Sequence, residues 1–369
     1  MLTTRRAAVT AIAGADSGRI TFTALVQGEN HPRSCVAYPA LTGGVNVGDT
    51  VVLNTTATAL GLGTGGVDFL ISNDSRQDSQ ETRGGSDGGE HIVKLRYTPL
   101  QHAVRAAEMD PAFAEIWKNA TSLEGTPVVV CGLHSQIGPV CAGVKAALPS
   151  ARVVYVMTDS AALPIAFSRL IGELKAAGLI DATITAGQAF GGDWECVADA
   201  SALIAARHIA GADVIVVAPG PGNAGTGTRF GFSSVEQGMQ LTLAALLDGA
   251  PVAVLRLSLA DRRARHHGLS HHSVTAIGRL TAEPCAVAVP LPPDTVDSAV
   301  YAALWASIQA SQIGARHRIV TADGAPGLRL LTEREVAVRS MGRGVDEDPM
   351  FFHAAAAAGA VAVAQIGPG

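Results

Sequence analysis

From Thr126 onward, apolar runs of strand length alternate with longer helical patterns, and this alternation constrains the fold more than any other feature of the 369-residue chain. The runs are rich in Val and Ile and lack regular polar positions, as is typical of parallel strands that are buried on both faces. We predict strands at residues 127–131, 153–157, 182–186, 213–218, 251–257, 286–291 and 318–321. Helices are predicted between them at residues 164–177, 198–210, 235–247 and 298–311. The pattern predicts a doubly wound, mostly parallel, Rossmann-like α/β sheet.

The first hundred residues follow a different pattern, in which short strand-like runs are separated by glycine turns. The runs are residues 19–27, 34–38, 45–53, 67–71 and 92–97. Short strands at this spacing predict a small β-barrel. Thr98 and Pro99 then form a helix-start signal, so we expect a barrel-like domain at 1–97 and the Rossmann-like domain at 98–369. The polar stretch 73–89 is predicted to be an exposed loop.

Composition excludes several classes of partner. The net charge is −5 and aromatic residues make up only 4%, which argues against binding to nucleic acid or to a membrane surface. The five cysteines include no C-x-x-C pair, a usage typical of reduced thiols in the cytoplasm. The Ala7–Gly14 run is too short and too weakly apolar to predict a secretion signal. We therefore expect a cytoplasmic protein, and the sequence leaves a homo-oligomer open.

The loops after the predicted strands are where a site is expected, because ligands of such sheets bind beyond the carboxyl ends of the strands. His134 follows the first strand and is a candidate general base or metal ligand. Asp159 and Asp193 follow the next two strands and are candidates to complete a metal site or orient a water. Each residue also has a local alternative: His134 would satisfy a backbone group, Asp159 would cap a helix, and Asp193 would interact with the dipole of a helix that begins near it.

The loop Pro219–Phe232 has 14 residues, more than a strand-to-helix connection usually needs. Its Gly220-x-Gly222-x-x-Gly225 pattern formally matches a dinucleotide fingerprint, but the helix-start signals come well downstream, so a redox dehydrogenase ranks last. Exposed amides and a fixed cation predict instead that the loop binds an anion. The residues predicted to hold this small anionic ligand are Gly220, Gly222, Asn223, Gly225, Thr226, Gly227 and Arg229.

Four of the 11 histidines fall within seven residues, from His266 to His272. His267 and His271 are four residues apart and face one point if the segment is helical, but Gly268 makes a loop equally compatible, and a loop changes which histidines pair. Imidazoles at this spacing suit zinc or another divalent metal. We predict that His267, His271 and His272 bind zinc or manganese. The alternative is that the arginines and imidazoles of this segment clamp a phosphate.

Three stretches of the chain, namely Arg265–Ser273, His91–Gln101 and Ala218–Phe232, resemble an uncharacterised bacterial group, domain-of-unknown-function family 3866. The resemblance covers nearly the whole chain. It implies a bacterial cytoplasmic protein, and it implies no activity, cofactor or residue role.

These residues together predict an enzyme that acts on a phosphorylated or carboxylated small molecule by hydrolysis or group transfer at a histidine-rich, metal-binding site. The alternative is a non-catalytic regulatory protein that binds a nucleotide or metabolite. Both hypotheses require that the histidine segment and the glycine-containing loop meet at one cavity.

Overall fold

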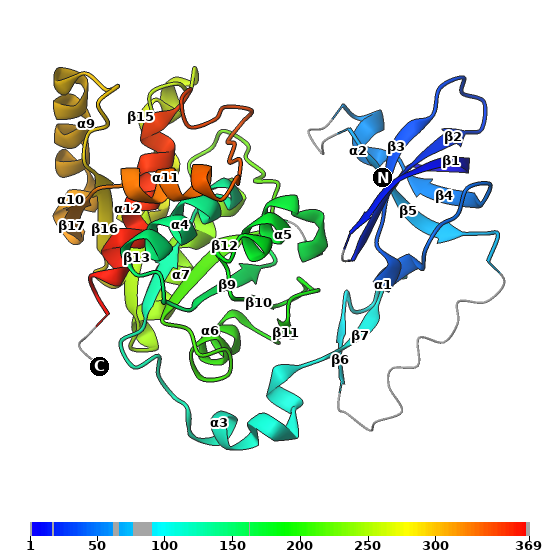
Figure 1. Ribbon diagram of the computed structural model, residues 1–369, viewed down its shortest axis with the longest axis horizontal. Helices are drawn as coiled ribbons and strands as arrows, with labels where there is room; N and C mark the ends of the chain where they lie inside the picture. Colours follow the sequence, from blue (N-terminus) through cyan, green and yellow to red (C-terminus); the bar gives the residue numbers. More distant parts are fainter. Residues whose placement is uncertain (1, 17, 62–65, 77–90, 162, 367–369) are drawn as a thin grey trace. The chain divides into compact units, whose positions relative to one another are not determined.

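The structure is a computed structural model, and it describes residues 2–16, 18–61, 66–76, 91–161 and 163–366 (Figure 1). The described residues of Met1–Gly89 and Val93–Val104 form one compact unit, and those of Glu90–Ile92 and Arg105–Gly369 form a second. Residues 77–89 of the predicted exposed loop lie outside the described residues. No helix in the described ranges is long and apolar enough to cross a membrane.

The first unit is a closed five-stranded barrel with the strand order β1-β2-β3-β5-β4, which confirms the predicted barrel. Its core is made of inward-facing apolar side chains such as Phe22 and Leu53, which are almost fully buried. The strands are β1 (Thr4–Asp16), β2 (Arg19–Val26), β3 (Arg33–Ala37), β4 (Thr50–Asn54) and β5 (Asp68–Asn73), with short helices α1 (Pro39–Thr42) and α2 (Thr56–Ala59). The prediction missed β1, because alanine favours strands little. In the structure, Ala7 and Val9 of this strand face the barrel core.

The helix start predicted at Thr98 is wrong. Strands β6 (His91–Lys94) and β7 (His102–Arg105) form a two-stranded sheet, and the residues between them turn. Leu95 and Tyr97 adopt left-handed backbone angles, with φ of 50° and 63°. The hydroxyl of Thr98 donates a hydrogen bond back to the carbonyl of Leu95 at 2.7 Å, so Thr98 stabilises the turn instead of capping a helix.

The second unit contains an eight-stranded sheet in which every pair of neighbours is parallel, in agreement with the predicted Rossmann-like fold. The strand order is β11-β10-β9-β12-β8-β13-β16-β17. The strands are β8 (Pro127–Val130), β9 (Val153–Thr158), β10 (Ala182–Thr185), β11 (Trp194–Glu195), β12 (Val214–Pro219), β13 (Ala250–Val254), β16 (Ala286–Pro290) and β17 (Arg318–Ala322).

Two hydrophobic cores lie on opposite faces of this sheet, because successive strand residues point to opposite sides. Val129 of β8 faces one core, whereas Val128 and Val130 face the other. The first core is covered by α4 (Ile137–Ala147), α5 (Arg169–Ala176), α11 (Ala325–Glu333) and α12 (Pro349–Val363). The second is covered by α6 (Asp199–His208), α7 (Gln237–Leu246), α9 (Ser298–Ala310) and α10 (Gln312–Arg316).

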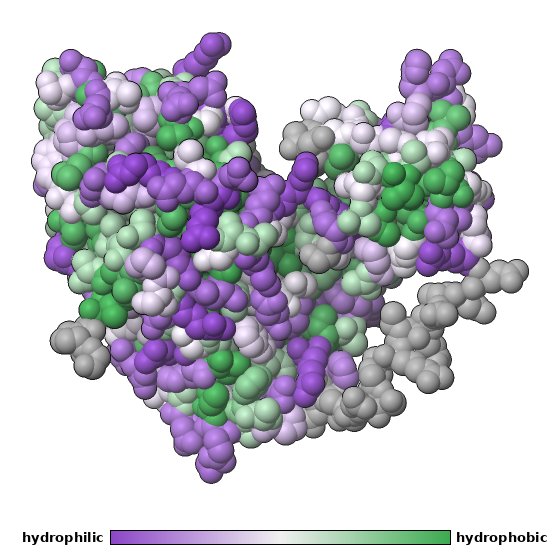
Figure 2. All heavy atoms as spheres, in the orientation of Figure 1, coloured by the Kyte–Doolittle hydropathy of each residue, from purple (hydrophilic) through white to green (hydrophobic). Residues whose placement is uncertain are grey.

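Helices α4 and α12 approach so closely that side chains are excluded between them. A Cβ atom on Gly143 of α4 would overlap the carbonyl group of Ala356 in α12. The rest of α12 is rich in buried alanine, which keeps this contact tight. On the visible face of the second unit, Figure 2 shows hydrophilic side chains interspersed with apolar ones.

Candidate functional site

The histidine segment follows strand β13 at the carboxyl edge of the sheet. After β13 the chain forms β14 (Leu257–Ser258), a short 3-10 turn (Ala264–His266), β15 (Gly268–Leu269) and α8 (His271–Thr275). Strands β14 and β15 pair in antiparallel fashion. Gly268 has a φ of 70°, a conformation that glycine adopts without strain. The segment is therefore a folded loop followed by a short helix, the alternative that Gly268 left open.

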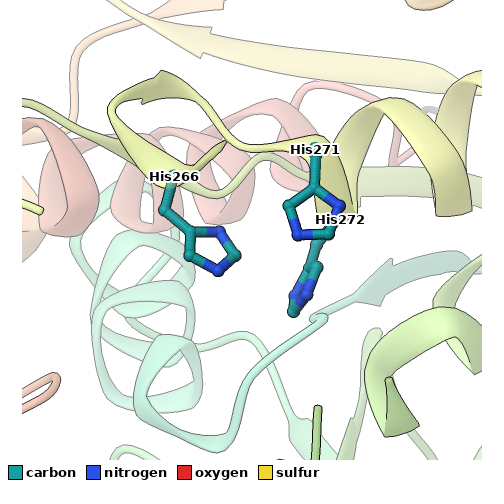
Figure 3. Close-up of side chains that lie close together, drawn as sticks. All are labelled: His266, His271 and His272. Atoms are coloured by element: carbon teal, nitrogen blue, oxygen red, sulfur yellow. The ribbon is translucent and has the colours of Figure 1, made fainter. Parts of the chain in front are cut away.

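This loop brings His266, His271 and His272 together, with one ligand atom from each ring lying within 4.8 Å of the others. Figure 3 shows the three rings extending from the two ends of the loop toward a common space. The ring centroids are 4.4 Å apart for His271 and His272 and 4.7 Å apart for His266 and His272. His266 is 1% exposed and His272 is 9% exposed.

One serine holds the geometry of these three rings, here called the histidine triad. Ser270 Oγ lies 2.7 Å from His266 Nδ1. The same oxygen accepts a hydrogen bond from the backbone N–H of His272 at 3.2 Å and so caps α8. Ser270 therefore fixes the ring of His266 relative to the start of the helix that carries the other two histidines.

The ring nitrogens of the triad differ in their partners. His266 Nε2 accepts a long hydrogen bond from Arg265 Nε at 3.4 Å. His272 Nδ1 lies 3.5 Å from Ser234 Oγ and 3.4 Å from Arg256 Nη1. His271 Nε2 is buried and has no hydrogen-bond partner among the described residues. A buried polar nitrogen without a partner is costly, so this atom marks a place where a ligand would be stabilised.

All three imidazoles are held in the neutral form. Burial, together with the charge of Arg256, lowers the pKa of His266 and of His272 to about 3. Burial also lowers the pKa of His271, with a smaller contribution from Arg265. A neutral imidazole has a free lone pair on one nitrogen, which is the form that binds a metal ion.

The residues present fit a divalent metal ion after a small inward movement. In a tetrahedral site, zinc–nitrogen bonds of about 2.0–2.1 Å place two ligand nitrogens about 3.4 Å apart, so the triad nitrogens, which lie within 4.8 Å of one another, would have to move closer together. The Ser270 contact to His266 is the kind of hydrogen bond to the second ring nitrogen that orients metal-binding histidines.

A buried charge network lies next to the triad. Asp261 is 4% exposed and accepts hydrogen bonds from Arg263 at 2.7 Å and from Arg256 at 3.3 Å. The hydrogen bond from Arg263 holds the pKa of Asp261 well below its usual range. Asp261 thus keeps a negative charge near the triad and partly offsets the cation of Arg256.

A cavity of about 520 Å³ opens beside His271. Three arginines line it, and no carboxylate in the described part of the chain forms an ion pair with any of them. The full lining is Arg229, Ala264, Arg265, Leu269, His271, Val274, Thr275, Arg279 and Gln312. Unpaired guanidinium groups around a concave surface favour an anionic ligand.

The glycine-containing loop reaches this cavity through one predicted residue, Arg229. The other six predicted anion-binding residues do not line it. Asn223 Oδ1 instead accepts hydrogen bonds from Ser233 Oγ at 2.6 Å and from Ser234 N at 3.0 Å. Thr226 N donates to the carbonyl of Gly231 at 2.8 Å. These hydrogen bonds join polar groups of the loop to one another and to the two serines that follow it, and so they hold the loop in a folded conformation.

The remaining glycines of the loop serve its shape. Gly222 and Gly227 have φ of 101° and 81°, which other residues rarely adopt. Gly227 lies against the guanidinium of Arg265, since a Cβ atom there would be 3.7 Å from Arg265 Nη1. Gly225 forms an isolated bridge with Phe232. Gly220 is buried directly after β12 and does not line the cavity.

Phe232, at the end of the loop, connects the loop to the triad. Its ring is stacked on His272 with centroids 3.8 Å apart and an interplanar angle of 3°. It also meets His271 edge-on at 5.8 Å. The sequence gives no signal for this residue, because an aromatic residue at a loop end has no distinctive spacing.

The choice of His267 as a ligand requires correction. His267 is exposed and lies outside the triad, and His266 takes its place. The prediction assumed helical spacing between His267 and His271, whereas the chain turns at Gly268. His266 and Ser270 are also four residues apart, and this spacing was the sequence signal that could have identified His266 as a ligand.

His134 and Asp193 have structural partners. His134 Nδ1 lies 3.1 Å from the carbonyl of Pro219, and its Nε2 lies 2.6 Å from Ser168 Oγ, which caps α5. Both oxygens of Asp193 bind Lys175 at 2.7 Å. The contact of His134 with the Pro219 carbonyl matches the backbone role that the sequence left open for it, whereas Asp193 pairs with Lys175 and does not begin a helix. Asp159 is exposed at the end of β9 and accepts a hydrogen bond from Gln188 N at 2.9 Å.

Comparison with known proteins adds one finding. Residues 34–359 match a family described as "Protein of unknown function (DUF3866)". No curated protein matches the chain.

Proposed function

Because the chain belongs to the DUF3866 family, whose description assigns no activity, we propose its function from the site alone. We propose an enzyme that holds a divalent metal ion, zinc or manganese, on His266, His271 and His272. It would catalyse hydrolysis or group transfer on a small anionic molecule bound in the adjacent cavity.

The observation that carries this proposal is the buried Nε2 of His271, which has no hydrogen-bond partner within the described ranges, because His271 belongs to the triad and also lines the cavity. One residue therefore joins the place suited to a metal with the place suited to an anion. When bound, the ion would supply an activated water and a positive charge next to the substrate.

The residues that line the cavity would bind the substrate. Arg229, Arg265 and Arg279 would bind the anionic group and neutralise charge that develops on it. Thr275 and Gln312 line the same cavity and offer neutral hydrogen bonds to the rest of the molecule. The volume of about 520 Å³ is within the range of small-molecule sites.

Measurement of the zinc content tests whether the triad binds a metal ion. Chelator-treated protein dialysed against zinc should retain about one ion per chain, as expected for a single three-histidine site. The double variant His266→Ala/His271→Ala should retain almost none. His267→Ala removes an exposed histidine of the same loop and should behave like the unchanged protein. Equal zinc in all three proteins would exclude the triad as the site.

Binding of anions, followed by the melting temperature, tests whether the cavity holds an anionic molecule. Inorganic phosphate and p-nitrophenyl phosphate should raise the melting temperature, and Arg229→Ala/Arg279→Ala should abolish that rise. Arg262→Ala is the matched control, because Arg262 is an exposed arginine that does not line the cavity. Malonate in place of phosphate tests a carboxylated substrate. Zinc-dependent release of p-nitrophenolate would demonstrate hydrolysis. If the anions still raise the melting temperature of Arg229→Ala/Arg279→Ala, the proposed cavity is contradicted.

A non-catalytic binding protein is the second candidate, and the charge around the triad favours it. Arg256 lies 3.4 Å from His272 Nδ1 and Arg265 lies 3.4 Å from His266 Nε2, which makes the surroundings cationic. Such surroundings favour an anion that contacts the imidazoles directly. Metal-free protein that binds phosphate with unchanged affinity after zinc is added would support this candidate over the enzyme.

We also propose that the protein works in the cytoplasm. All five cysteines are free and buried, and a reducing compartment keeps thiols in this form. Expression with a fluorescent tag, compared with an exported control, tests this location.

A further inference from the structure

Arg265 lines the cavity and also forms a hydrogen bond to the histidine triad. Its side chain belongs to the wall of the cavity of about 520 Å³, and its Nε donates to His266 Nε2 at 3.4 Å. Gly227 lies behind the guanidinium, since a Cβ atom there would be 3.7 Å from Arg265 Nη1. An anion in the cavity and a nitrogen of the triad are therefore both within reach of one guanidinium group.

The hydrogen bond from Arg265 fixes which nitrogen of His266 carries the proton. A guanidinium can only donate, so His266 Nε2 accepts with its lone pair. In the neutral ring the proton is then on Nδ1, which donates it to Ser270 Oγ at 2.7 Å. A metal-binding histidine has this same arrangement, with one ring nitrogen held by a hydrogen bond and the other free to bind the ion. Arg265 thus occupies the lone pair that a metal ion on His266 would need.

The second arginine beside the triad, Arg256, is held much more firmly. Arg256 Nη1 lies 3.4 Å from His272 Nδ1, but Arg256 is 8% exposed and pairs with the buried Asp261 at 3.3 Å. Arg265 is exposed, and no carboxylate in the described ranges forms an ion pair with it. Arg265 can therefore turn away from the triad at the cost of one long hydrogen bond, whereas Arg256 would also leave a buried carboxylate.

We propose that Arg265 couples the metal ion to the anionic ligand, because it competes with the ion for His266 Nε2 and is drawn away by an anion in the cavity. This inference rests on the proposed function, since it requires both ligands to bind where we place them. A charged phosphate oxygen accepts a stronger hydrogen bond from a guanidinium than a neutral imidazole nitrogen does. Once Arg265 has turned to the anion, His266 Nε2 is available to the ion.

Electrostatics act in the same direction. A guanidinium beside His266 repels a divalent cation, and an anion bound to that guanidinium offsets the repulsion. Because coupling between two ligands is reciprocal, zinc should raise the affinity for phosphate by the same factor by which phosphate raises the affinity for zinc. The protein would therefore hold its metal ion most tightly when an anionic ligand occupies the cavity.

Zinc affinity of the full chain, measured against a coloured chelator that also fixes the free zinc concentration, tests the proposal. Without phosphate, Arg265→Met should bind zinc about fivefold more tightly than the unchanged protein, because one competing hydrogen bond is removed. Arg229→Met is the matched control. Arg229 is a cation of the same cavity that no hydrogen bond in the described chain joins to the triad, so its loss should raise zinc affinity less.

Inorganic phosphate supplies the second comparison. It should raise the zinc affinity of the unchanged protein by about fivefold, the same single hydrogen bond, and that of Arg265→Met by less. Zinc affinity no higher in Arg265→Met than in Arg229→Met would overturn the proposal, and so would an equal effect of phosphate on the unchanged protein and Arg265→Met.

The triad variant separates this inference from the proposed function. If His266→Ala/His271→Ala abolishes zinc binding while the Arg265 comparisons fail, the metal site stands and only the coupling is overturned. If the double variant binds zinc as the unchanged protein does, the metal site and the coupling are both overturned.

Discussion

His134 and the histidine triad occupy the same edge of one sheet, yet they differ in what their nitrogens do. His134 follows β8 and the triad follows β13, the strand next to it. Burial lowers the pKa of His134 to about 4, much as it lowers those of His266 and His272. Both ring nitrogens of His134 have protein partners, whereas His271 Nε2 has none among the described residues.

This comparison shows that a depressed histidine pKa at a strand end does not identify a functional residue. The pKa reports burial, which a structural histidine shares with a ligand-binding one. The useful distinction is an unpartnered nitrogen that borders a cavity. The predictions below test whether this distinction separates a residue that maintains the fold from residues that bind a ligand.

The largest expected effect is on stability. His134→Ala should lower the free energy of unfolding by about 3 kcal/mol, because it removes the hydrogen bonds to the Pro219 carbonyl and to Ser168 Oγ together with the packing of the ring. His271→Ala should change it by less than about 1 kcal/mol, because the Nε2 that it deletes has no hydrogen-bond partner in the described part of the chain. Urea unfolding followed by tryptophan fluorescence reports on the α/β unit, which holds all three tryptophans. If the two variants lose equal free energy of unfolding, an unpartnered nitrogen does not distinguish a ligand-binding histidine from a structural one.

Acid should reveal the same contrast. His134 has an ordinary pKa of 6.5 when unfolded and about 4 when folded, so the unfolded chain takes up the proton first as the pH falls. Its contribution to stability is constant above pH 6.5 and is lost between pH 6.5 and 4. The unchanged protein should therefore lose about 2 kcal/mol more than His134→Gln over that window, after allowance for partial exposure. Urea titrations at stepped pH measure this difference, and parallel curves for the two proteins would contradict it.

The smallest expected effect concerns the ring that supports the triad. Phe232→Leu removes the stacking contact with His272, worth about 1 kcal/mol, and should weaken zinc binding by about fivefold. Phe230→Leu is the matched control, because Phe230 is an exposed phenylalanine of the same loop. Competition with a coloured zinc chelator measures both affinities. If the two variants bind zinc equally, the loop does not position His272.

The second unit was predictable because its strands are continuous apolar runs. The runs predicted at residues 127–131 and 213–218 correspond to β8 and β12, whose residues are all buried, since a strand buried on both faces needs no polar alternation. The alanine-rich strand β1 could not be identified, because most of its residues are exposed and only Ala7 and Val9 face the barrel core.

The site was predictable only where its residues are adjacent in sequence. His271 and His272 begin one helix, so their shared location follows from the sequence. The exchange of His267 for His266 depends on the turn at Gly268, which the sequence left open. Arg279 reaches the cavity from a single π-helical turn, residues 276–280, a geometry that has no clear sequence signal.

X-ray absorption spectroscopy of the zinc-loaded protein tests the central claim most directly. The account predicts three imidazole nitrogens at about 2.0 Å from the ion and no sulfur ligand. The same spectrum from His267→Ala should be unchanged. A spectrum with one imidazole or none, or with sulfur in the first shell, would contradict the claim that His266, His271 and His272 hold the metal.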